Sequence, residues 1–382
     1  MYSGSKIDMK DFYEQLATFV DQLPAGYPRT ESGVELRILH KLFTPEEAEL
    51  FMHLTLLGEE PQVVAHRAKL PVDIVSQRLD EMEKKGLVMG IHRSGKPTAY
   101  LAQHFAVGFW EGQTNRLDRE LVEDFEEYLP SLFNAELWRK APQIRTIPVG
   151  ESIPNLAEAM PYELAEKVIA SHSTFAVTNC ICRNEMHIIG KGCDKPVETC
   201  MSFGGVAKYI IASGRGRKIS REEILAILKQ ADEAGLVLSP ANSKDPAFLC
   251  ACCGDCCGIL RSAKLHPKPS SIISSPYMVA HDDVICSGCG TCVDRCQMEA
   301  ITIPNGIAEV NLDRCIGCGL CVSTCTTGAM TLVRKPESEQ RFIPKDIVAT
   351  NLQLAQTRGV LSNVDLVTML VKSKIDRLVA RI

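Results

Sequence analysis

The sequence predicts a multidomain α+β protein. It comprises a helical N-terminal module with a β-ribbon, a mainly helical cysteine-rich middle domain, a smaller domain with short strand pairs, and C-terminal helices. Three observations lead to this prediction. The chain has 382 residues, enough for two or three domains at roughly 150 residues each. Helical periodicity alternates with short strand-like runs that end at Gly, Pro or Asn. All 17 cysteines lie between residues 180 and 325.

We place the domain boundaries where these patterns change. The expected segments are an N-terminal arm and helix-ribbon domain (1–115), a helical and proline-rich linker (116–160), a cysteine-rich domain (161–270), a second cysteine-rich domain (271–336) and C-terminal helices (337–382). Closely spaced prolines mark the end of the linker, at Pro142, Pro148, Pro154 and Pro161.

The composition is that of an ordinary globular protein, with 45% apolar residues, 23% charged residues and a formal net charge of −5. This mild acidity disfavours nucleic acid and anionic membranes as partners. No apolar run reaches the roughly 18 residues that a membrane span needs, and the N-terminus lacks a signal-peptide core. We therefore expect a cytoplasmic protein of an anaerobic host, whose cysteines bind metal rather than form disulfides.

The N-terminal domain begins with an amphipathic helix from Met9 to Val20, which we interpret as a packing arm. Thr44, Pro45 and Glu47 then form a capping-box pattern that opens a helix through Leu57. Further helices are expected over residues 62–68 and 72–85, the latter ended by Gly86, and two strands over residues 87–101. This order resembles a winged helix-turn-helix domain of the MarR-like and TrmB-like regulators.

The resemblance implies DNA binding by the helix at 72–85, but the charges of that helix argue against it. Phosphate contacts need a basic surface. The helix carries four acids against three bases: Asp73, Asp80, Glu81 and Glu83 against Arg78, Lys84 and Lys85. We therefore favour a protein-protein or dimer interface for this module and keep DNA binding as the alternative.

The linker should hold an acidic amphipathic helix from Glu120 to Leu129 that ends at Pro130. A helix from Pro161 to Ala170 leads into the first cysteine block, Cys180, Cys182, Cys193 and Cys200. On an extended chain, Cys180 and Cys182 point to the same side and can face one metal. One cubane is the favoured ligand; zinc and buried free thiols are the alternatives. Arg183 could donate to cluster sulfur or to an anionic group of a partner, or form an ordinary ion pair.

Two helices over residues 203–238, joined by a basic loop at 214–218, precede the second block. No phosphate-binding glycine motif is present, so we expect no flavin or nicotinamide site. The second block has five cysteines in eight residues: Cys250, Cys252, Cys253, Cys256 and Cys257. The nine upstream cysteines allow two cubanes with one spare thiol, a five-cysteine and a four-cysteine cluster, or one cluster from both blocks. We expect one or two additional iron-sulfur clusters.

The last cysteines form two runs with the spacing C-x2-C-x2-C-x3-C, beginning at Cys286 and Cys315. This spacing lets three thiolates from one turn meet three corners of a four-iron, four-sulfur cube, and glycines inside each run suit the sharp turn. Between the runs, Asn305 and Gly306 predict a hairpin. A second strand pair should join residues 277–280 to 330–333.

Residues 275–336 resemble the bacterial-type ferredoxins with two [4Fe-4S] clusters. The resemblance implies that the fourth cysteine of each run binds the other cluster. It assigns Cys286, Cys289, Cys292 and Cys325 to cluster 1, and Cys315, Cys318, Cys321 and Cys296 to cluster 2. The chain departs from that family where a proline usually follows the fourth cysteine, because Gln297 and Thr326 stand there. Each restores an N–H near a cluster, which should raise the reduction potential.

Residues 145–336 as a whole resemble larger ferredoxin-like iron-sulfur proteins of anaerobes, with C-x-C-R and CCxCC-type blocks upstream. This implies a multi-cluster electron-transfer protein or subunit of an oxidoreductase complex. Its partners would be redox-enzyme subunits that contain flavin or metal, in a homo- or hetero-oligomer. The alternatives are an iron-sulfur transcriptional sensor and an enzyme like heterodisulfide reductase, whose CCG motifs resemble Cys250 to Cys257 locally.

No general acid, base or nucleophile constellation is evident, so we expect no catalytic residues. After Pro336, helices are expected over residues 343–357 and 363–382. The last has one apolar stripe, Val367, Val371, Leu378 and Ile382, which we interpret as a docking face.

Overall fold

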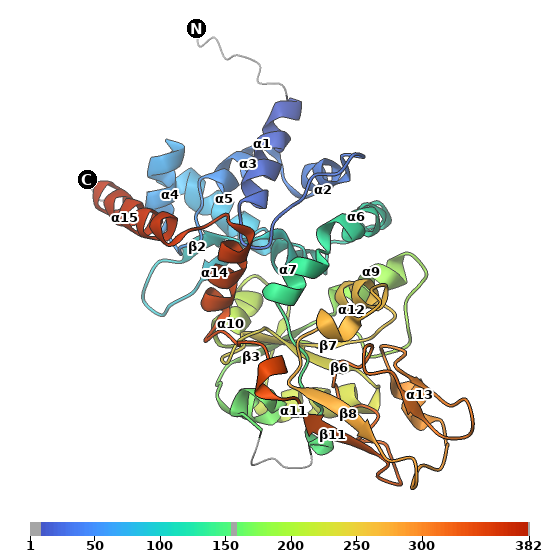
Figure 1. Ribbon diagram of the computed structural model, residues 1–382. Helices are drawn as coiled ribbons and strands as arrows, with labels where there is room; N and C mark the ends of the chain where they lie inside the picture. The colour runs from blue at the N-terminus through green and yellow to red at the C-terminus, as the bar shows by residue number, and fades with distance from the viewer. Residues whose placement is uncertain (1–8, 154–158, 381–382) are drawn as a thin grey trace. The chain divides into compact units, whose positions relative to one another are not determined.

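In the computed structural model, the described residues are 9–153 and 159–380 (Figure 1). They form two compact units. Unit 1 consists of Met1–Leu132, Ile211–Arg215 and Ala355–Ile382, and unit 2 of Phe133–Ile210 and Gly216–Leu354. No helix in the described part of the chain is both long and apolar enough to span a membrane.

Unit 1 begins with five helices and a two-stranded antiparallel ribbon. The helices are α1 (Met9–Asp21), α2 (Val34–Leu42), α3 (Pro45–Met52), α4 (Pro61–Ala68) and α5 (Val72–Lys84), and the strands are β1 (Val88–Ile91) and β2 (Ala99–Ala102). Thr44 and Glu47 form the predicted capping box. Gly86 ends α5 with a φ of 78°. The order of elements over residues 44–102 is therefore the predicted one.

Helix α3 is shorter than predicted, because it ends at Met52 instead of Leu57. The side chain of Thr55 accepts a hydrogen bond from the amide of Leu57 at 3.1 Å and donates to Glu59 at 3.0 Å. Such side-chain bonds to the backbone compete with helix formation. The chain consequently turns toward α4 at this point.

Helix α6 (Arg119–Leu132) runs through Pro130, where the sequence predicted its end. Proline near the end of a helix removes only one backbone hydrogen bond. The helix is held from its buried face, where Phe125 stacks on Trp110 with ring centroids 4.1 Å apart. Packing therefore outweighs the loss at Pro130.

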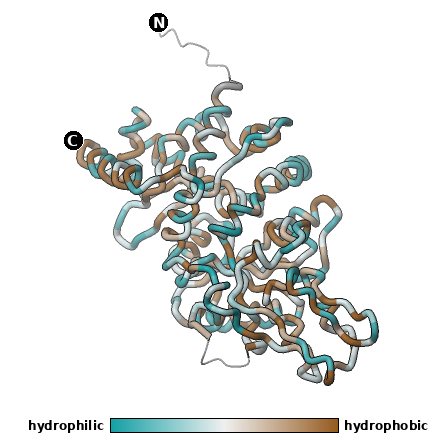
Figure 2. The backbone as a smooth tube through the Cα atoms, in the orientation of Figure 1, coloured by the Kyte–Doolittle hydropathy of each residue, from teal (hydrophilic) through white to brown (hydrophobic). Residues whose placement is uncertain are grey.

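The C-terminal helices are α14 (Ile347–Arg358) and α15 (Asn363–Val379). Helix α15 packs within unit 1 through its polar face: Ser373 is buried and donates to Glu59 at 2.5 Å, and Asp376 pairs with Arg67 at 2.6 Å. The stripe that we interpreted as a docking face points the other way, with Val367, Val371 and Leu378 exposed. Figure 2 shows apolar positions recurring along this helix. Ile382 lies outside the described residues.

Unit 2 contains a five-stranded antiparallel sheet in the order β5-β3-β4-β7-β6. Its strands are β3 (Phe175–Thr178), β4 (Cys200–Phe203), β5 (Arg217–Ile219), β6 (Val237–Pro240) and β7 (Phe248–Cys252). The prediction of a mainly helical middle domain missed this sheet, although five helices also lie within residues 161–270. Strands of three to five residues give too short a pattern to separate from helix or loop. Strand β5 lies where the sequence predicted a basic loop. Exposed basic residues such as Arg217 and Lys218 are typical of loops and of edge strands alike.

Unit 2 also contains several helices. These are α7 (Ala135–Lys140), α8 (Ala165–Ala170), α9 (Ile181–Ile188), α10 (Gly204–Ala212), α11 (Arg221–Glu233), α12 (Gly258–Lys264) and α13 (Thr291–Arg295). The single helix predicted from Pro161 to Ala170 is a 3₁₀ turn, Pro161–Glu163, followed by α8.

The last part of unit 2 contains both predicted strand pairs. Strand β8 (Tyr277–His281) pairs antiparallel with β11 (Met330–Arg334), and β9 (Ile301–Thr302) pairs with β10 (Glu309–Val310). Arg334 pairs with Glu163 at 2.7 Å, and the Tyr277 hydroxyl donates to the same carboxylate at 3.1 Å. These contacts anchor the β8–β11 pair to the 3₁₀ turn at Pro161–Glu163.

Candidate metal centres

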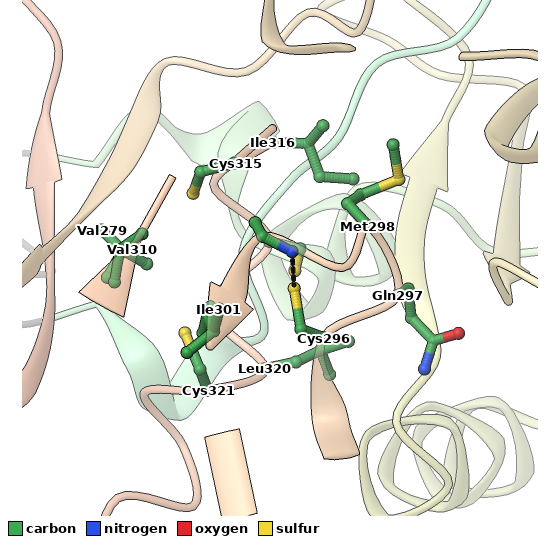
Figure 3. A pocket seen from close by; sticks show the side chains of 13 residues that line it. Val279, Cys296, Gln297, Met298, Ile301, Val310, Cys315, Ile316, Leu320 and Cys321 are labelled. Carbon is green, nitrogen blue, oxygen red and sulfur yellow. Dashed lines mark hydrogen bonds between the residues drawn. The ribbon is translucent and has the colours of Figure 1, made fainter. Parts of the chain in front are cut away.

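A cavity beside the β9–β10 hairpin is lined by four cysteines (Figure 3). Cys315, Cys318 and Cys321 come from the second run, and Cys296 comes from the first. Apolar side chains complete the lining, among them Ile301 and Leu320. The chain thus gathers four sulfurs around one space in an apolar setting.

A second cavity is lined by the other four cysteines of the two runs. Cys286, Cys289 and Cys292 come from the first run, and Cys325 comes from the second. The structure therefore groups the eight cysteines into the same two sets of four that the sequence assigned, with the fourth member exchanged between runs.

Glycine shapes both turns. Gly288 and Gly317 occupy equivalent places in the two runs, and each has a φ of 64°, where a side chain is strained. A Cβ at Gly317 would lie 2.1 Å from the carbonyl oxygen of Tyr277, and one at Gly288 would lie 1.9 Å from that of Gly306. Backbone from another segment fills the space that a side chain would need.

The electrostatics of the first cavity fit a cationic cluster core. Burial raises the pKa of Cys318 to about 12 and raises the pKa of Cys321, with the neighbouring thiols adding to the effect. Burial also raises the pKa of Cys296, whose sulfur accepts a hydrogen bond from the amide of Ala300 at 3.2 Å. Four thiolates facing one apolar space repel one another, and iron-sulfur clusters are held by thiolates. The donor set therefore fits a [4Fe-4S] cluster.

The two cavities differ in exposure. Cys289 at the second cavity is exposed, and hydrogen bonding to Thr291 lowers the pKa of its thiol. Cys315 and Cys321 at the first cavity are buried. A cluster in the second cavity is consequently the one nearer to solvent.

The nine upstream cysteines come from several elements of unit 2. Cys200 on β4 lies directly opposite Cys250 on β7. Cys180 is the N-cap of α9 and Cys182 lies in its first turn, so the prediction that the two share one extended segment is wrong. Cys257 is likewise the N-cap of α12.

The sulfurs of these cysteines form two groups. The triad consists of Cys193, Cys253 and Cys256, with Sγ–Sγ distances of 3.8 Å from Cys193 to Cys253 and 3.5 Å from Cys193 to Cys256. In the other group, which we call the six-sulfur group, thiol-thiol interactions connect successive members: Cys180, Cys182, Cys257, Cys252, Cys250 and Cys200. The loop from Cys252 to Cys257 serves both groups, because its inner pair belongs to the triad and its outer pair to the six-sulfur group.

Arg183 lies beside the triad. Its side chain is buried, with Nη1 3.7 Å from the Cys253 sulfur and Nη2 donating to the Ala251 carbonyl oxygen at 3.0 Å. Interaction with the Cys256 thiol and the charge of Arg183 lower the pKa of Cys253. Of the three roles that the sequence left open for Arg183, the contact with Cys253 favours donation to sulfur. Thr199, a further partner of Arg183, carried no signal in the sequence.

Gln297 links the upstream cysteines to the last two runs. Its side-chain oxygen accepts a hydrogen bond at 2.8 Å from the amide of Gly254, which lies between Cys253 and Cys256. A Cβ at Gly254 would lie 2.1 Å from the Gln297 carbonyl oxygen. The sequence singled out this position because proline is absent, but it gave no sign of this contact.

Comparison with protein families gave a match to the 4Fe-4S dicluster domain over residues 285–329. The match covers both cysteine runs and the hairpin between them, a minor part of the chain. Comparisons with curated proteins and with solved structures gave no match. Residues 285–329 are thus similar to a domain that holds two [4Fe-4S] clusters, which agrees with the two four-cysteine cavities.

Proposed function

We propose that this chain is a multi-cluster iron-sulfur electron-transfer protein, or subunit, that relays single electrons between redox partners in a cytoplasmic redox complex of an anaerobe. The observation that carries the proposal is the pair of four-cysteine cavities, each completed by a cysteine from the other run. Cys286, Cys289, Cys292 and Cys325 would hold cluster 1, and Cys296, Cys315, Cys318 and Cys321 cluster 2. Each cluster accepts and releases one electron, and the protein tunes its potential through burial and hydrogen bonds.

The packing of unit 2 supports a relay from the upstream cysteines to cluster 2. Cys252 and Cys257 of the six-sulfur group lie in the same hydrophobic core as Met298 and Leu320, which flank the cluster 2 cavity. Cys296 and Cys318 pack against this core. We propose that the six-sulfur group holds an additional iron-sulfur cluster, which exchanges electrons with cluster 2.

Cluster 1 is the proposed exit to a redox-enzyme subunit that contains flavin or metal. Cys289 is exposed, and the apolar side chains of Val284, Ile285 and Ile307 are exposed in the segments beside the cavity. Electron transfer between proteins needs close approach of the redox centres, and exposed apolar side chains favour docking. The surrounding exposed acids Asp282, Asp283 and Asp294 favour a basic rim on that partner.

The transcriptional-sensor alternative has weaker support. The exposed positions of α5 include Asp73, Asp80 and Glu81, and these charges repel phosphate. We therefore assign the winged-helix-like module to protein contacts.

The proposal is tested by iron and acid-labile sulfide analysis of anaerobically purified protein, together with an EPR-monitored redox titration. We expect about twelve irons per chain and separate one-electron transitions. About eight irons would contradict the additional cluster alone. Colourless protein without labile sulfide would overturn the proposed function as a whole.

A further inference from the structure

The triad differs from the two four-cysteine cavities in how closely its sulfurs approach. Cys193 Sγ lies 3.5 Å from Cys256 Sγ and 3.8 Å from Cys253 Sγ, and all three sulfurs lie within 4.8 Å of one another. Cys253 and Cys256 are buried. The three thiols therefore converge on one point in the interior of unit 2.

This spacing matches ligands of a single ion. Zinc binds thiolate at about 2.3 Å in a tetrahedron, which places two sulfurs about 3.8 Å apart. Around a cubane each thiolate binds a different iron at a different corner, so the sulfurs stand much farther apart. The sulfurs of the triad share one small volume, which one ion can occupy and a cube cannot.

We propose that Cys193, Cys253 and Cys256 bind a single Zn²⁺ ion, separate from the iron-sulfur clusters. The ion would tie the loop after α9, which carries Cys193, to the loop between β7 and α12, which carries the other two. Three thiolates and Zn²⁺ carry a net charge of −1. The buried Arg183 guanidinium, 3.7 Å from Cys253 Sγ, offsets this charge.

The arrangement of the loop explains why one short segment serves two kinds of metal. Cys253 and Cys256 belong to the triad, whereas Cys252 and Cys257 belong to the six-sulfur group. Fixing the inner pair with a redox-inactive ion would hold the outer pair in place while the neighbouring cluster changes its charge. Gln297 also holds this loop, through the Gly254 amide.

The test is metal analysis of the full chain, purified anaerobically from iron-replete cells, with zinc K-edge absorption spectroscopy. We expect about one zinc per chain with sulfur neighbours near 2.3 Å. Cys193→Ser should lose at least three quarters of the zinc and keep its iron and labile sulfide. The matched control, Cys200→Ser in the six-sulfur group, should keep its zinc.

Cys193→His gives a second readout in case the serine variant fails to fold, because histidine binds zinc well. It should keep the zinc and show a nitrogen neighbour in its spectrum. The proposal is overturned if zinc is absent from the wild type, if Cys193→Ser loses about four irons with their sulfide, or if Cys200→Ser also removes the zinc. A chain with zinc but without labile sulfide would refute the proposed electron-transfer function and leave the triad site intact.

Discussion

Gln297 is the residue through which one cysteine loop contacts another. The Gly254 amide that it binds is buried, so removing the acceptor would leave a buried donor without its partner. Such a loss costs about 1–3 kcal/mol. We therefore expect Gln297→Ala to lower the free energy of unfolding of unit 2 by this amount. The measurement is anaerobic denaturant unfolding in a Trp110→Phe background, followed through Trp138, which is buried in unit 2.

Thr326 provides the matched control for this variant. It also follows the fourth cysteine of its run, but it is exposed. Thr326→Ala should change the free energy of unfolding by no more than about 0.5 kcal/mol. Equal effects of the two substitutions would show that the contact between Gln297 and Gly254 contributes nothing to stability.

His104 makes the stability of unit 1 depend on pH. Burial lowers the pKa of His104 to about 4, although a bond to the backbone of Val107 partly opposes this shift. The unfolded chain takes up a proton near pH 6.5, whereas the folded one does so only near pH 4, so stability falls as the pH falls through this window. The loss reaches on the order of 3 kcal/mol at pH 4.

The measurement compares unfolding at pH 7 and pH 5 in a Trp138→Phe background, where Trp110 of unit 1 is the remaining tryptophan. His104→Gln should reduce the difference in the free energy of unfolding between pH 7 and pH 5. His66→Gln, at an exposed position, should leave this difference unchanged. An unaltered pH dependence in His104→Gln would assign the acid sensitivity to other groups.

Helix α15 has apolar residues on the face that points away from the rest of unit 1. Val364, Val367, Val371, Ile375 and Leu378 are all exposed. Their positions are symmetric about Val371, so an antiparallel copy of the helix would place Val364 against Leu378 and Val367 against Ile375. A twofold interface requires this self-complementarity. We expect the chain to form a homodimer through α15.

Val371→Lys would place two charges at the twofold axis of this dimer. Sedimentation should then show a monomer where the wild type is a dimer, with a dissociation constant raised at least a hundredfold. Val348→Lys is the control, because Val348 is also exposed but lies on α14. A monomeric wild type at all accessible concentrations would rule out this interface.

Some of the helices and strands could be predicted from the sequence and others could not. The α3–α5 and ribbon order and the β9–β10 pair were predictable, because capping residues, Gly86 and the Asn305-Gly306 turn act locally. The β8–β11 pair joins distant segments and was predictable because the two cysteine runs between them resemble those of a two-cluster ferredoxin. The five-stranded sheet was not, because its strands are short and are defined by partners far along the chain. The division of the upstream cysteines into triad and six-sulfur group depends on the same long-range pairing, as Cys200 and Cys250 show.

The folding stability of the two units should depend on bound metal to different degrees. Unit 1 has a core of aromatic and aliphatic side chains in which Phe105, Phe109 and Trp110 pack together. The core around β8 to β11 is small, and Cys315 and Cys321 are part of it. Where cysteines make up the core, the free energy of metal binding becomes free energy of folding.

Anaerobic removal of iron with a chelator and a mild oxidant should therefore unfold the region of residues 277–334 while unit 1 stays folded. Hydrogen exchange measured by mass spectrometry should show loss of protection in β8–β11 and unchanged protection in α2 to α6. Apo-protein rebuilt with iron and sulfide serves as the control and should regain protection. If both units lost protection together, the folding of unit 1 would depend on the clusters as well, and the two compact units would not be independent in stability.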